Sequence, residues 1–188
     1  MRKILTMLTC GTVLPGLAGA AAAGDSYAEA RAQIENLQAR YVLALDFHDA
    51  DAYAATFTKD GVLDWARGQI VGREAIRKWA ASGVYNPTRG AKHVDGWPAA
   101  YRHFITNQVI KVDGDHATAI TYWFQGGNLQ DRGKFQFGLF GTYEDELVKV
   151  DGQWLFKKRA IYNEGLKNRH RAGMPDPDPF LKGTKPGK

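Results

Sequence analysis

An acidic residue stands within an apolar stretch of the chain, RYVLALDFH at residues 40–48. Burying an unpaired ionised group is costly, so Asp46 should be exposed, paired, or kept for chemistry. Buried carboxylates with a specific partner are frequent in proton-transfer sites. We therefore interpret Asp46 as a catalytic acid in a pocket. The alternatives are a carboxylate that reaches solvent at a helix end and one that pairs structurally with an arginine.

The natural partner for this acid is His103, which lies near the start of the strand-like run YRHFITNQVIKV. In an extended strand its side chain shares a face with those of Ile105 and Asn107, because successive side chains alternate. A lone histidine is ordinarily a core residue with satisfied hydrogen bonds. Opposite a carboxylate, however, histidine is the usual general base near neutral pH, and we interpret His103 in that way.

Tyrosines can supply the complementary proton. Tyr41 lies five residues before Asp46, and its hydroxyl is the first candidate for a donor to a departing oxygen, with Tyr53 as the alternative. The aromatic share of 12% suits a small apolar or aromatic substrate. Further residues are predicted to bind that substrate, although each can equally be an ordinary core residue: Tyr53, Trp65, Asn107, Tyr122, Trp123, Phe140 and Arg159.

Other kinds of site lack a signal in the sequence. The residues HDAD at 48–51 are metal-ligand types, but they bridge a helix end and a turn, and no His-x3-His spacing accompanies them. Gly-x-Ser-x-Gly, Walker and dinucleotide motifs are absent. Cys10 is the only cysteine, and it lies in an N-terminal segment that we expect to be removed. We expect no metal and no cofactor.

The two ends of the chain differ in composition from its middle. Residues 1–23 have a charged start, an apolar centre and small residues for cleavage, which is typical of a secretory signal peptide. This predicts an exported protein, periplasmic in a Gram-negative source, with no membrane span in the remainder. Residues 166–188 form a basic tail that contains prolines. The formal charge of +5 is mild, so no nucleic-acid partner is expected.

One domain is expected between these ends, over residues 26–165, and it begins with helices. A long helix is predicted at 26–48, where Ser26 and Glu29 have the spacing of a capping box. Asp49 is expected to cap a short second helix, and a third is expected between Gly72 and Gly83. One face of the long helix carries residues that are expected to be buried: Ile34, Leu37, Tyr41, Leu45 and His48. After Tyr41 the helix becomes apolar on all sides.

Strands dominate the second half of the chain. Two short strands are expected at VLDW, after a turn at Asp60-Gly61, and at QIV. Four long strand-like runs follow: residues 101–112, 116–125, 134–150 and 153–164. Asp113-Gly114 and Asp151-Gly152 predict hairpins, and Gly138 and Gly141 predict bends or bulges. The order indicates an α+β fold with a strongly curved antiparallel sheet around the helices, and the loop at 84–99 is a candidate lid.

The motifs of this chain, taken together in their order, resemble those of a known superfamily. The pieces are the Tyr41/Asp46 pair, Tyr53 with FTKDG at 57–61, GREAI at 72–76, His103 with Asn107, DGDHATA at 113–119, Tyr122, GTY at 141–143, DGQW at 151–154 and Arg159. This pattern resembles the nuclear transport factor 2-like superfamily, and within it the SnoaL-like branch. The resemblance implies a conical α+β barrel with one pocket between the long helix and the concave sheet.

The resemblance also implies a range of functions. The superfamily includes dehydratases, isomerases, polyketide cyclases, epoxide hydrolases, lyases and non-catalytic proteins. Its members commonly form dimers or trimers through the sheet, so a homo-oligomer is expected here. In the bile-acid dehydratase branch, a Tyr-x4-Asp pair on this helix belongs to the active site, and some relatives place an anion-binding arginine where Arg159 stands. We therefore expect an exported, cofactor-free lyase of dehydratase type that uses Asp46, His103 and Tyr41. The alternatives are an isomerase or cyclase with the same residues and a non-catalytic ligand-binding module.

Overall fold

The computed structural model describes residues 25–84, 92–93, 95–96, 99–129, 131–167 and 169. The expected signal peptide at 1–23, most of the candidate lid at 84–99 and nearly all of the tail lie outside the described residues. The elements in chain order are α1 (Tyr27–Asp46), α2 (Ala50–Ala55), β1 (Phe57–Trp65), β2 (Gly68–Val71), α3 (Arg73–Ser82), β3 (Tyr101–Asp113), β4 (His116–Gly127), β5 (Gln136–Val150) and β6 (Gln153–Asn163).

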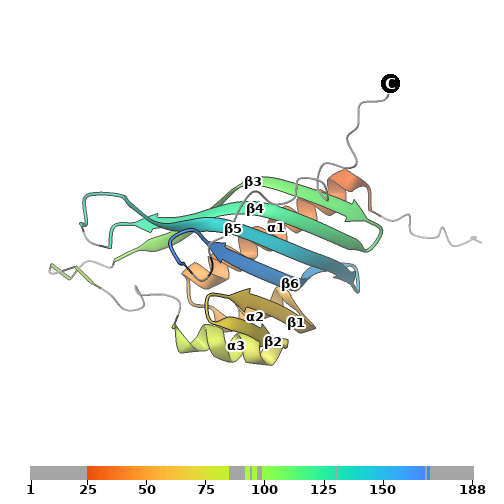
Figure 1. The fold of residues 1–188 in the computed structure, drawn as a ribbon, viewed down its shortest axis with the longest axis horizontal. Helices are drawn as coiled ribbons and strands as arrows, with labels where there is room; N and C mark the ends of the chain where they lie inside the picture. The colour runs from red at the N-terminus through yellow and green to blue at the C-terminus, as the bar shows by residue number, and fades with distance from the viewer. Residues whose placement is uncertain are drawn as a thin grey trace, which may run out of the picture.

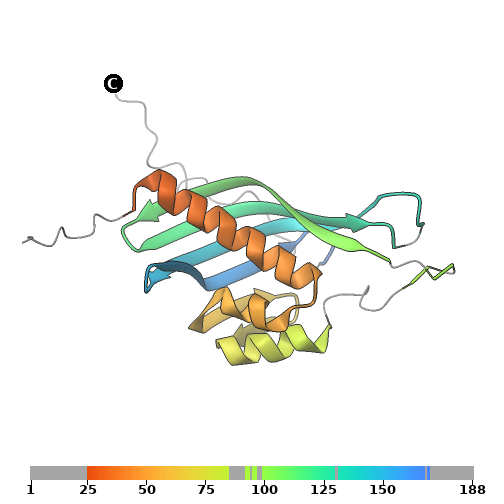
Figure 2. The ribbon, with the colours of Figure 1, turned by 180° about the vertical axis from the view of Figure 1, so that it is seen from behind.

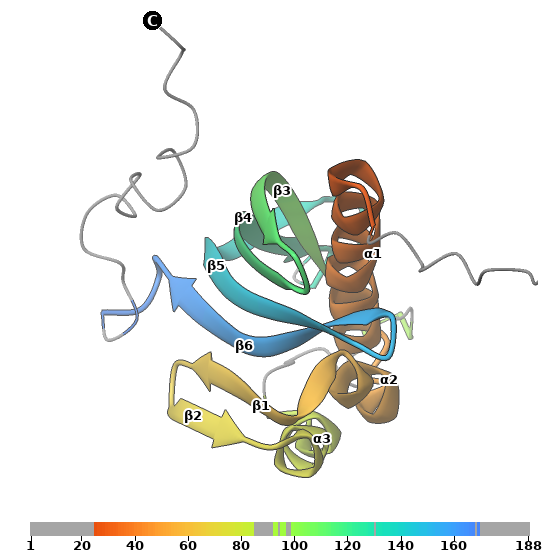
Figure 3. The same cartoon turned by 90° about the vertical axis from the view of Figure 1, so that its right-hand side faces the viewer.

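The six strands form one curved sheet with the order β2-β1-β6-β5-β4-β3. Helix α1 crosses one face of this sheet, and α3 packs beside β1 and β2 (Figures 1 and 2). Seen from the end, strands β3 to β6 curve around α1 (Figure 3). The predicted α+β class with a curved sheet around a long helix is confirmed. The sheet is mixed and open, because β1 pairs with β6 in parallel and β2 and β3 remain its edges.

Local sequence signals set the helix ends. The capping box is present: the Glu29 N–H donates to the Ser26 hydroxyl, and the Glu29 carboxylate accepts from the Ser26 backbone N–H. The Asp49 side chain caps α2, and Gly83 ends α3 in the left-handed conformation that glycine adopts without strain. One expectation is wrong: the end of α1 is not buried on all sides, because Leu43 and Phe47 are exposed.

Turns and bulges account for the rest of the sheet. Both Asp-Gly hairpins are confirmed, with Gly114 at φ +56° and Gly152 at φ +77°. Asp60-Gly61 is not a turn, because β1 runs through it from Phe57 and shifts register there against β6. A Cβ on Gly61 would lie 3.1 Å from the carbonyl oxygen of Phe156, so glycine lets the two strands approach.

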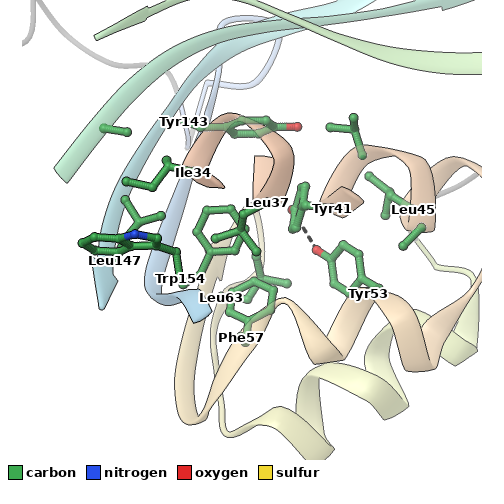
Figure 4. Packing of buried hydrophobic residues seen from close by; sticks show 14 of the residues in the cluster. Ile34, Leu37, Tyr41, Leu45, Tyr53, Phe57, Leu63, Tyr143, Leu147 and Trp154 are labelled. Atoms are coloured by element: carbon green, nitrogen blue, oxygen red, sulfur yellow. Dashed lines mark hydrogen bonds between the residues drawn. The ribbon is translucent and has the colours of Figure 1, made fainter. Parts of the chain in front are cut away.

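The core lies between α1 and the inner face of the sheet. The predicted stripe of α1 packs there, except that His48 falls outside the helix. Aromatic rings from α1, α2, β1, β5 and β6 fill the centre, and Figure 4 shows Tyr41 in the middle of them. Within the described residues, none of the helices has both the length and the hydropathy needed to cross a membrane.

Candidate active site

A cavity of about 500 Å³ opens at the end of this core. It is bounded by the C-terminal half of α1, the inner face of β3 to β6, the β1–β2 turn and α3. Most of its wall is aromatic or aliphatic, with a few polar groups among them. The lining residues are Tyr41, Leu45, Trp65, Ala66, Arg67, Trp79, Val84, His103, Trp123, Gln125, Leu139, Tyr143, Ile161, Asn163 and Leu166.

Asp46 and His103 form a closely bonded pair at this cavity. Nδ1 of His103 lies 2.6 Å from Oδ1 of Asp46, and the backbone N–H of His103 donates to Oδ2 at 2.9 Å. The carboxylate is 5% exposed, whereas the His103 ring lines the cavity. Both carboxylate oxygens therefore bind the same residue, which fixes the strand β3 and the imidazole relative to α1. The predicted contact is present; its catalytic role stays a prediction.

The hydrogen bonds assign the protons within this pair. An ionised carboxylate only accepts, so Nδ1 of His103 carries the proton that it shares with Asp46. Nε2 then holds a lone pair, and within the described residues no group occupies it. Asp46 is also the last residue of α1, where the helix dipole disfavours an anion, so the histidine compensates a charge in an unfavourable place.

Tyr41 and Tyr53 form a second polar pair beside the first. The hydroxyl of Tyr53 donates to that of Tyr41 at 2.7 Å, and Figure 4 shows the two groups facing one another. Tyr41 lines the cavity, whereas Tyr53, predicted to bind substrate, is not among the lining residues and packs behind Tyr41 and Trp79. Burial raises the pKa of Tyr41 and, more strongly, that of Tyr53. Both hydroxyls therefore keep their protons at neutral pH.

Two further inward-facing residues, Trp123 and Tyr143, complete the aromatic wall. Their rings stack with centroids 5.6 Å apart, and the Trp123 ring lies 6.2 Å from the His103 ring. The indole N–H of Trp123 donates to the carbonyl of Tyr162 across the intervening Gly141. A Cβ at Gly141 would lie 2.1 Å from that carbonyl oxygen, so only glycine allows the arrangement.

Arg159 does not line this cavity, contrary to the substrate-binding prediction. Its guanidinium is fully buried and forms two hydrogen bonds with the Asp145 carboxylate, at 2.7 and 2.6 Å. It also lies 4.1 Å from the centroid of the Tyr41 ring and 4.3 Å from that of Tyr143. These two rings separate the arginine from the cavity. Arg159 is therefore a core residue, the alternative that the sequence left open, and a structural ion pair with Asp145 holds it there.

The electrostatics of that pair have a clear physical origin. Burial alone would lower the pKa of Arg159, but the charge of Asp145 and its hydrogen bonds raise it above its ordinary value. Burial raises the pKa of the Asp145 carboxyl, and the charge of Arg159 opposes that rise. We take the ionised pair as the resting state, because a guanidinium is not deprotonated in proteins. Gln38 and Thr121 extend the network beneath it.

Three more predicted binding residues lie away from the cavity. Asn107 is exposed at φ +52°, in a register shift between Thr106 and Val109 that breaks the strand alternation on which its prediction rested. Tyr122 is 49% exposed because its neighbour Trp123 points inward, and adjacent strand residues face opposite sides. Phe140 is on the same outer face. Trp65 and Trp123 do line the cavity, and their role in substrate binding stays a prediction.

The structure adds lining residues to which the sequence assigned no role. Arg67, Gln125 and Asn163 supply polar groups, while Trp79, Tyr143 and Leu166 supply apolar surface. The usable signals were strand alternation, which places Gln125 on the face of Trp123, and the apolar face of the third helix, which carries Trp79. Within the described part of the chain, no group of three or more His, Cys, Asp or Glu side chains is arranged to hold a metal ion.

The start of the predicted tail packs on the domain. Arg169 forms an ion pair with Asp64 at 3.0 Å and donates to the carbonyl of Ile161, and its own carbonyl accepts from the N–H of Asn163. Leu166 contributes to the cavity wall. The residues just after β6 therefore belong to the surroundings of the site.

Comparisons with known proteins agree with this architecture. A family model described as a SnoaL-like domain matches residues 26–160. No functionally curated protein matches the chain. A solved structure of a variant of Rv3472 from Mycobacterium tuberculosis, described as a protein of unknown function, is 29% identical, with 72% of each chain covered and a TM-score of 0.59.

Two other solved structures have more informative descriptions. A protein from Catenulispora acidiphila, in complex with S-DNPA, is 27% identical over 73% of this chain and 96% of that one, with a TM-score of 0.60. A candidate scytalone dehydratase from Novosphingobium aromaticivorans is 26% identical over 72% of this chain and 84% of that one, with a TM-score of 0.57. A chain similar to this one has thus been solved in complex with S-DNPA.

Proposed function

The chain belongs to the SnoaL-like family, and from that premise we propose that it is a cofactor-free lyase of the dehydratase type. Its substrate carries a hydroxyl group two carbons from a carbonyl, on or beside an aromatic ring. His103 acts as the general base, Asp46 orients it, and Tyr41 protonates the departing hydroxyl. The observation that carries the proposal is the His103 ring, held by a buried carboxylate with its Nε2 free at an open, mainly apolar cavity.

These three side chains account for each proton that moves in the elimination. Nε2 of His103 removes a proton from the carbon beside the carbonyl, and the electrons of that C–H bond become the new C=C bond. The C–O bond to the hydroxyl breaks, and Tyr41 transfers its proton to that oxygen, so that water departs. Asp46 stabilises the imidazolium that forms, as the acid does in other His–acid pairs. Proton exchange with solvent after product release restores His103 and Tyr41.

The surroundings of Tyr41 support its role as the acid. Its ring lies over the Arg159 guanidinium, whose positive charge lowers the pKa of the hydroxyl against the larger effect of burial. The hydrogen bond from Tyr53 acts in the same direction as that charge. A negative charge that develops on the Tyr41 oxygen is therefore stabilised by two groups already in place, with no reorganisation during the reaction.

The competing functions differ from a lyase in testable ways. An isomerase or cyclase uses the same base and acid without losing water, and a ligand-binding module needs no proton transfer. The open cavity favours a protein that binds a ligand, and the paired Asp46 and His103 favour catalysis. The likeness to a candidate scytalone dehydratase favours elimination among the catalytic options.

The test is a screen of hydroxylated ketones fused to aromatic rings, with mass spectrometry to detect the loss of water. Each active compound is then assayed with His103→Gln and with Arg40→Gln, a control at an exposed residue that does not line the cavity. We expect His103→Gln to lower kcat by about a hundred- to ten-thousand-fold, because a general base contributes that much. Arg40→Gln should retain the turnover. Full activity in His103→Gln, or products of unchanged mass, would overturn the lyase proposal.

We also propose that the chain forms a homo-oligomer through the outer face of its sheet. Aromatic side chains gather there at the end of β3, β4 and β5, and Phe137 is 77% exposed. Contacts between Phe104, Phe124, Phe135 and Phe137 join them into one cluster. Exposed apolar patches of this kind commonly mark protein interfaces. Light scattering should show a dimer or trimer that Phe137→Gln weakens; a monomer at all concentrations would refute it.

Export through the signal peptide at residues 1–23 is a proposal as well, because it rests on the sequence pattern alone. The mass of the protein recovered from the exported fraction tests it. A chain that begins within a few residues of Ala23 is expected, and an intact Met1 would contradict export.

A further inference from the structure

A positive charge at the cavity lacks a counter-charge. Arg67, in the turn between β1 and β2, lines the cavity, and no Asp or Glu is among the described lining residues. Within the described part of the chain no carboxylate pairs with Arg67, whereas Arg169, which also packs on β1, is paired with Asp64. Among the lining residues that the structure describes, Arg67 is therefore the one with a permanent charge, and that charge is free to bind a ligand.

The position of this charge is defined by its aromatic neighbours. The guanidinium carbon of Arg67 lies 5.6 Å from the centroid of the Trp65 ring, within the range of a cation–π contact. Trp65 in turn packs edge-on against Trp79 at 4.9 Å, and both rings line the cavity. The cation is thus held at the rim of an aromatic wall, and it is accessible because Arg67 itself is exposed.

Neutral hydrogen-bonding groups accompany the cation. Oδ1 of Asn163 accepts from the N–H of Gly165 at 2.9 Å, which orients the amide and leaves its NH₂ group as a donor. Gln125 lies directly opposite His103 in the β3–β4 register, so its amide is next to the proposed base. The polar part of the wall therefore consists of donors and amides around one cation. Such a wall suits a ligand rich in acceptor oxygens.

We propose that the substrate is an aromatic anion, a ring compound whose carboxylate is bound by Arg67 while its ring packs between the tryptophan and tyrosine side chains. This inference rests on the proposed function for the reaction at His103, and it adds the chemical class of the substrate. Arg67 then has the anion-binding role that the sequence suggested for Arg159. A planar guanidinium binds a carboxylate through paired hydrogen bonds, which fixes the orientation of the ring toward the base.

Binding of two matched probes tests the inference without knowledge of the natural substrate. Naphthoate and naphthamide have the same ring, and only the first is an anion. We expect naphthoate to bind about tenfold more tightly at low ionic strength, because one charge-assisted contact typically contributes about that factor. Added salt should reduce this preference, since Arg67 is exposed. In Arg67→Gln the preference should disappear, and in Arg40→Gln, which removes an exposed arginine remote from the cavity, it should persist.

His103→Gln separates this inference from the proposed reaction. We expect this variant to lose elimination and to keep the preference for naphthoate. Equal affinities for the two probes in the unmodified protein, or a preference that survives Arg67→Gln, would overturn the inference and leave the lyase proposal standing. A preference abolished by His103→Gln would also overturn it, because the imidazolium would then be the anion-binding group. Loss of the preference in Arg67→Gln without any His103-dependent elimination would uphold the inference and refute the reaction.

Discussion

Two buried carboxylates lie on either side of the aromatic wall of this protein, and they have different partners. Asp46 binds His103, whose ring lines the cavity. Asp145 binds Arg159, which is completely buried beneath Tyr41 and Tyr143. Both acids accept two hydrogen bonds from their partner, so burial and pairing alone do not distinguish them. Two properties differ. The His103 ring lies at the cavity and can exchange a proton, whereas the Arg159 guanidinium is enclosed and keeps its proton.

This comparison shows what makes a buried acid a candidate for chemistry. A carboxylate next to a permanent, enclosed cation keeps one charge state and contributes to the specificity of the core. A carboxylate next to a titratable group at a cavity can stabilise a change of charge during a reaction. Access and the nature of the partner thus decide the role, and the following substitutions should separate the two pairs.

The largest expected effect is that of Asp46→Asn on turnover. Asparagine keeps the shape of aspartate but carries no charge, so it cannot stabilise the protonated form of His103. We expect kcat to fall by about a hundred- to ten-thousand-fold. The melting temperature should hold or rise, because a buried charge at an unfavourable helix end is removed. Kinetics and thermal unfolding of the same variant measure both quantities, and an unfolded or fully active variant would mean that Asp46 is not there for chemistry.

Asp145→Asn should show the reverse pattern. It leaves the guanidinium of Arg159 buried without a counter-charge, which typically costs about 3–5 kcal/mol of the free energy of unfolding. Turnover per folded molecule should change only a few-fold, since the pair does not line the cavity. Urea denaturation and active-site titration distinguish the two quantities. Turnover lost at unchanged stability would assign Asp145 to the catalytic machinery and break the comparison.

Tyr41→Phe tests the residue that packs on Arg159 and also lines the cavity with His103. Loss of its hydroxyl should lower kcat by about a hundredfold if Tyr41 is the proton donor. Tyr53→Phe serves as the matched control, because it removes the same hydrogen bond but leaves the Tyr41 hydroxyl at the cavity. That variant should lose only a few-fold in kcat. Equal and small losses of kcat in both variants would mean that Tyr41 is not the proton donor. Tyr143 would then be the next candidate.

The smallest expected effect is the change that Tyr53→Phe makes to stability at alkaline pH. Burial raises the pKa values of Tyr41, Tyr53 and Tyr143 above their ordinary value near 10. Above about pH 10 the unfolded chain therefore binds fewer protons than the folded one, and the free energy of unfolding falls as pH rises, by up to about 1.4 kcal/mol per pH unit for each tyrosine. Urea denaturation between pH 9 and 11 should show this decline, and Tyr53→Phe should make it shallower. An equal slope in both proteins would contradict the assignment.

Much of the framework could be predicted from short-range patterns. The capping box at Ser26, the N-cap at Asp49, the glycine end of the third helix and the two Asp-Gly hairpins each depend on neighbouring residues, and all are present. The contact between Asp46 and His103 could also be predicted, because Asp46 stands in an apolar stretch, His103 lies on a strand-like run, and the resemblance to a known family implies one pocket between the helix and the sheet.

The sequence by itself therefore determined the class of fold, the hairpins and the candidate acid and base, since periodicity and turn chemistry are local properties. The tertiary structure decided which arginine faces the cavity. Counted from the hairpin turn, the initial register of β5 and β6 would place Asp145 opposite Lys158, but a bulge between Glu146 and Leu147 moves it opposite Arg159. That one-residue shift directs the guanidinium into the core and leaves Arg67 as the cation at the cavity, because a bulge exchanges the two faces of a strand.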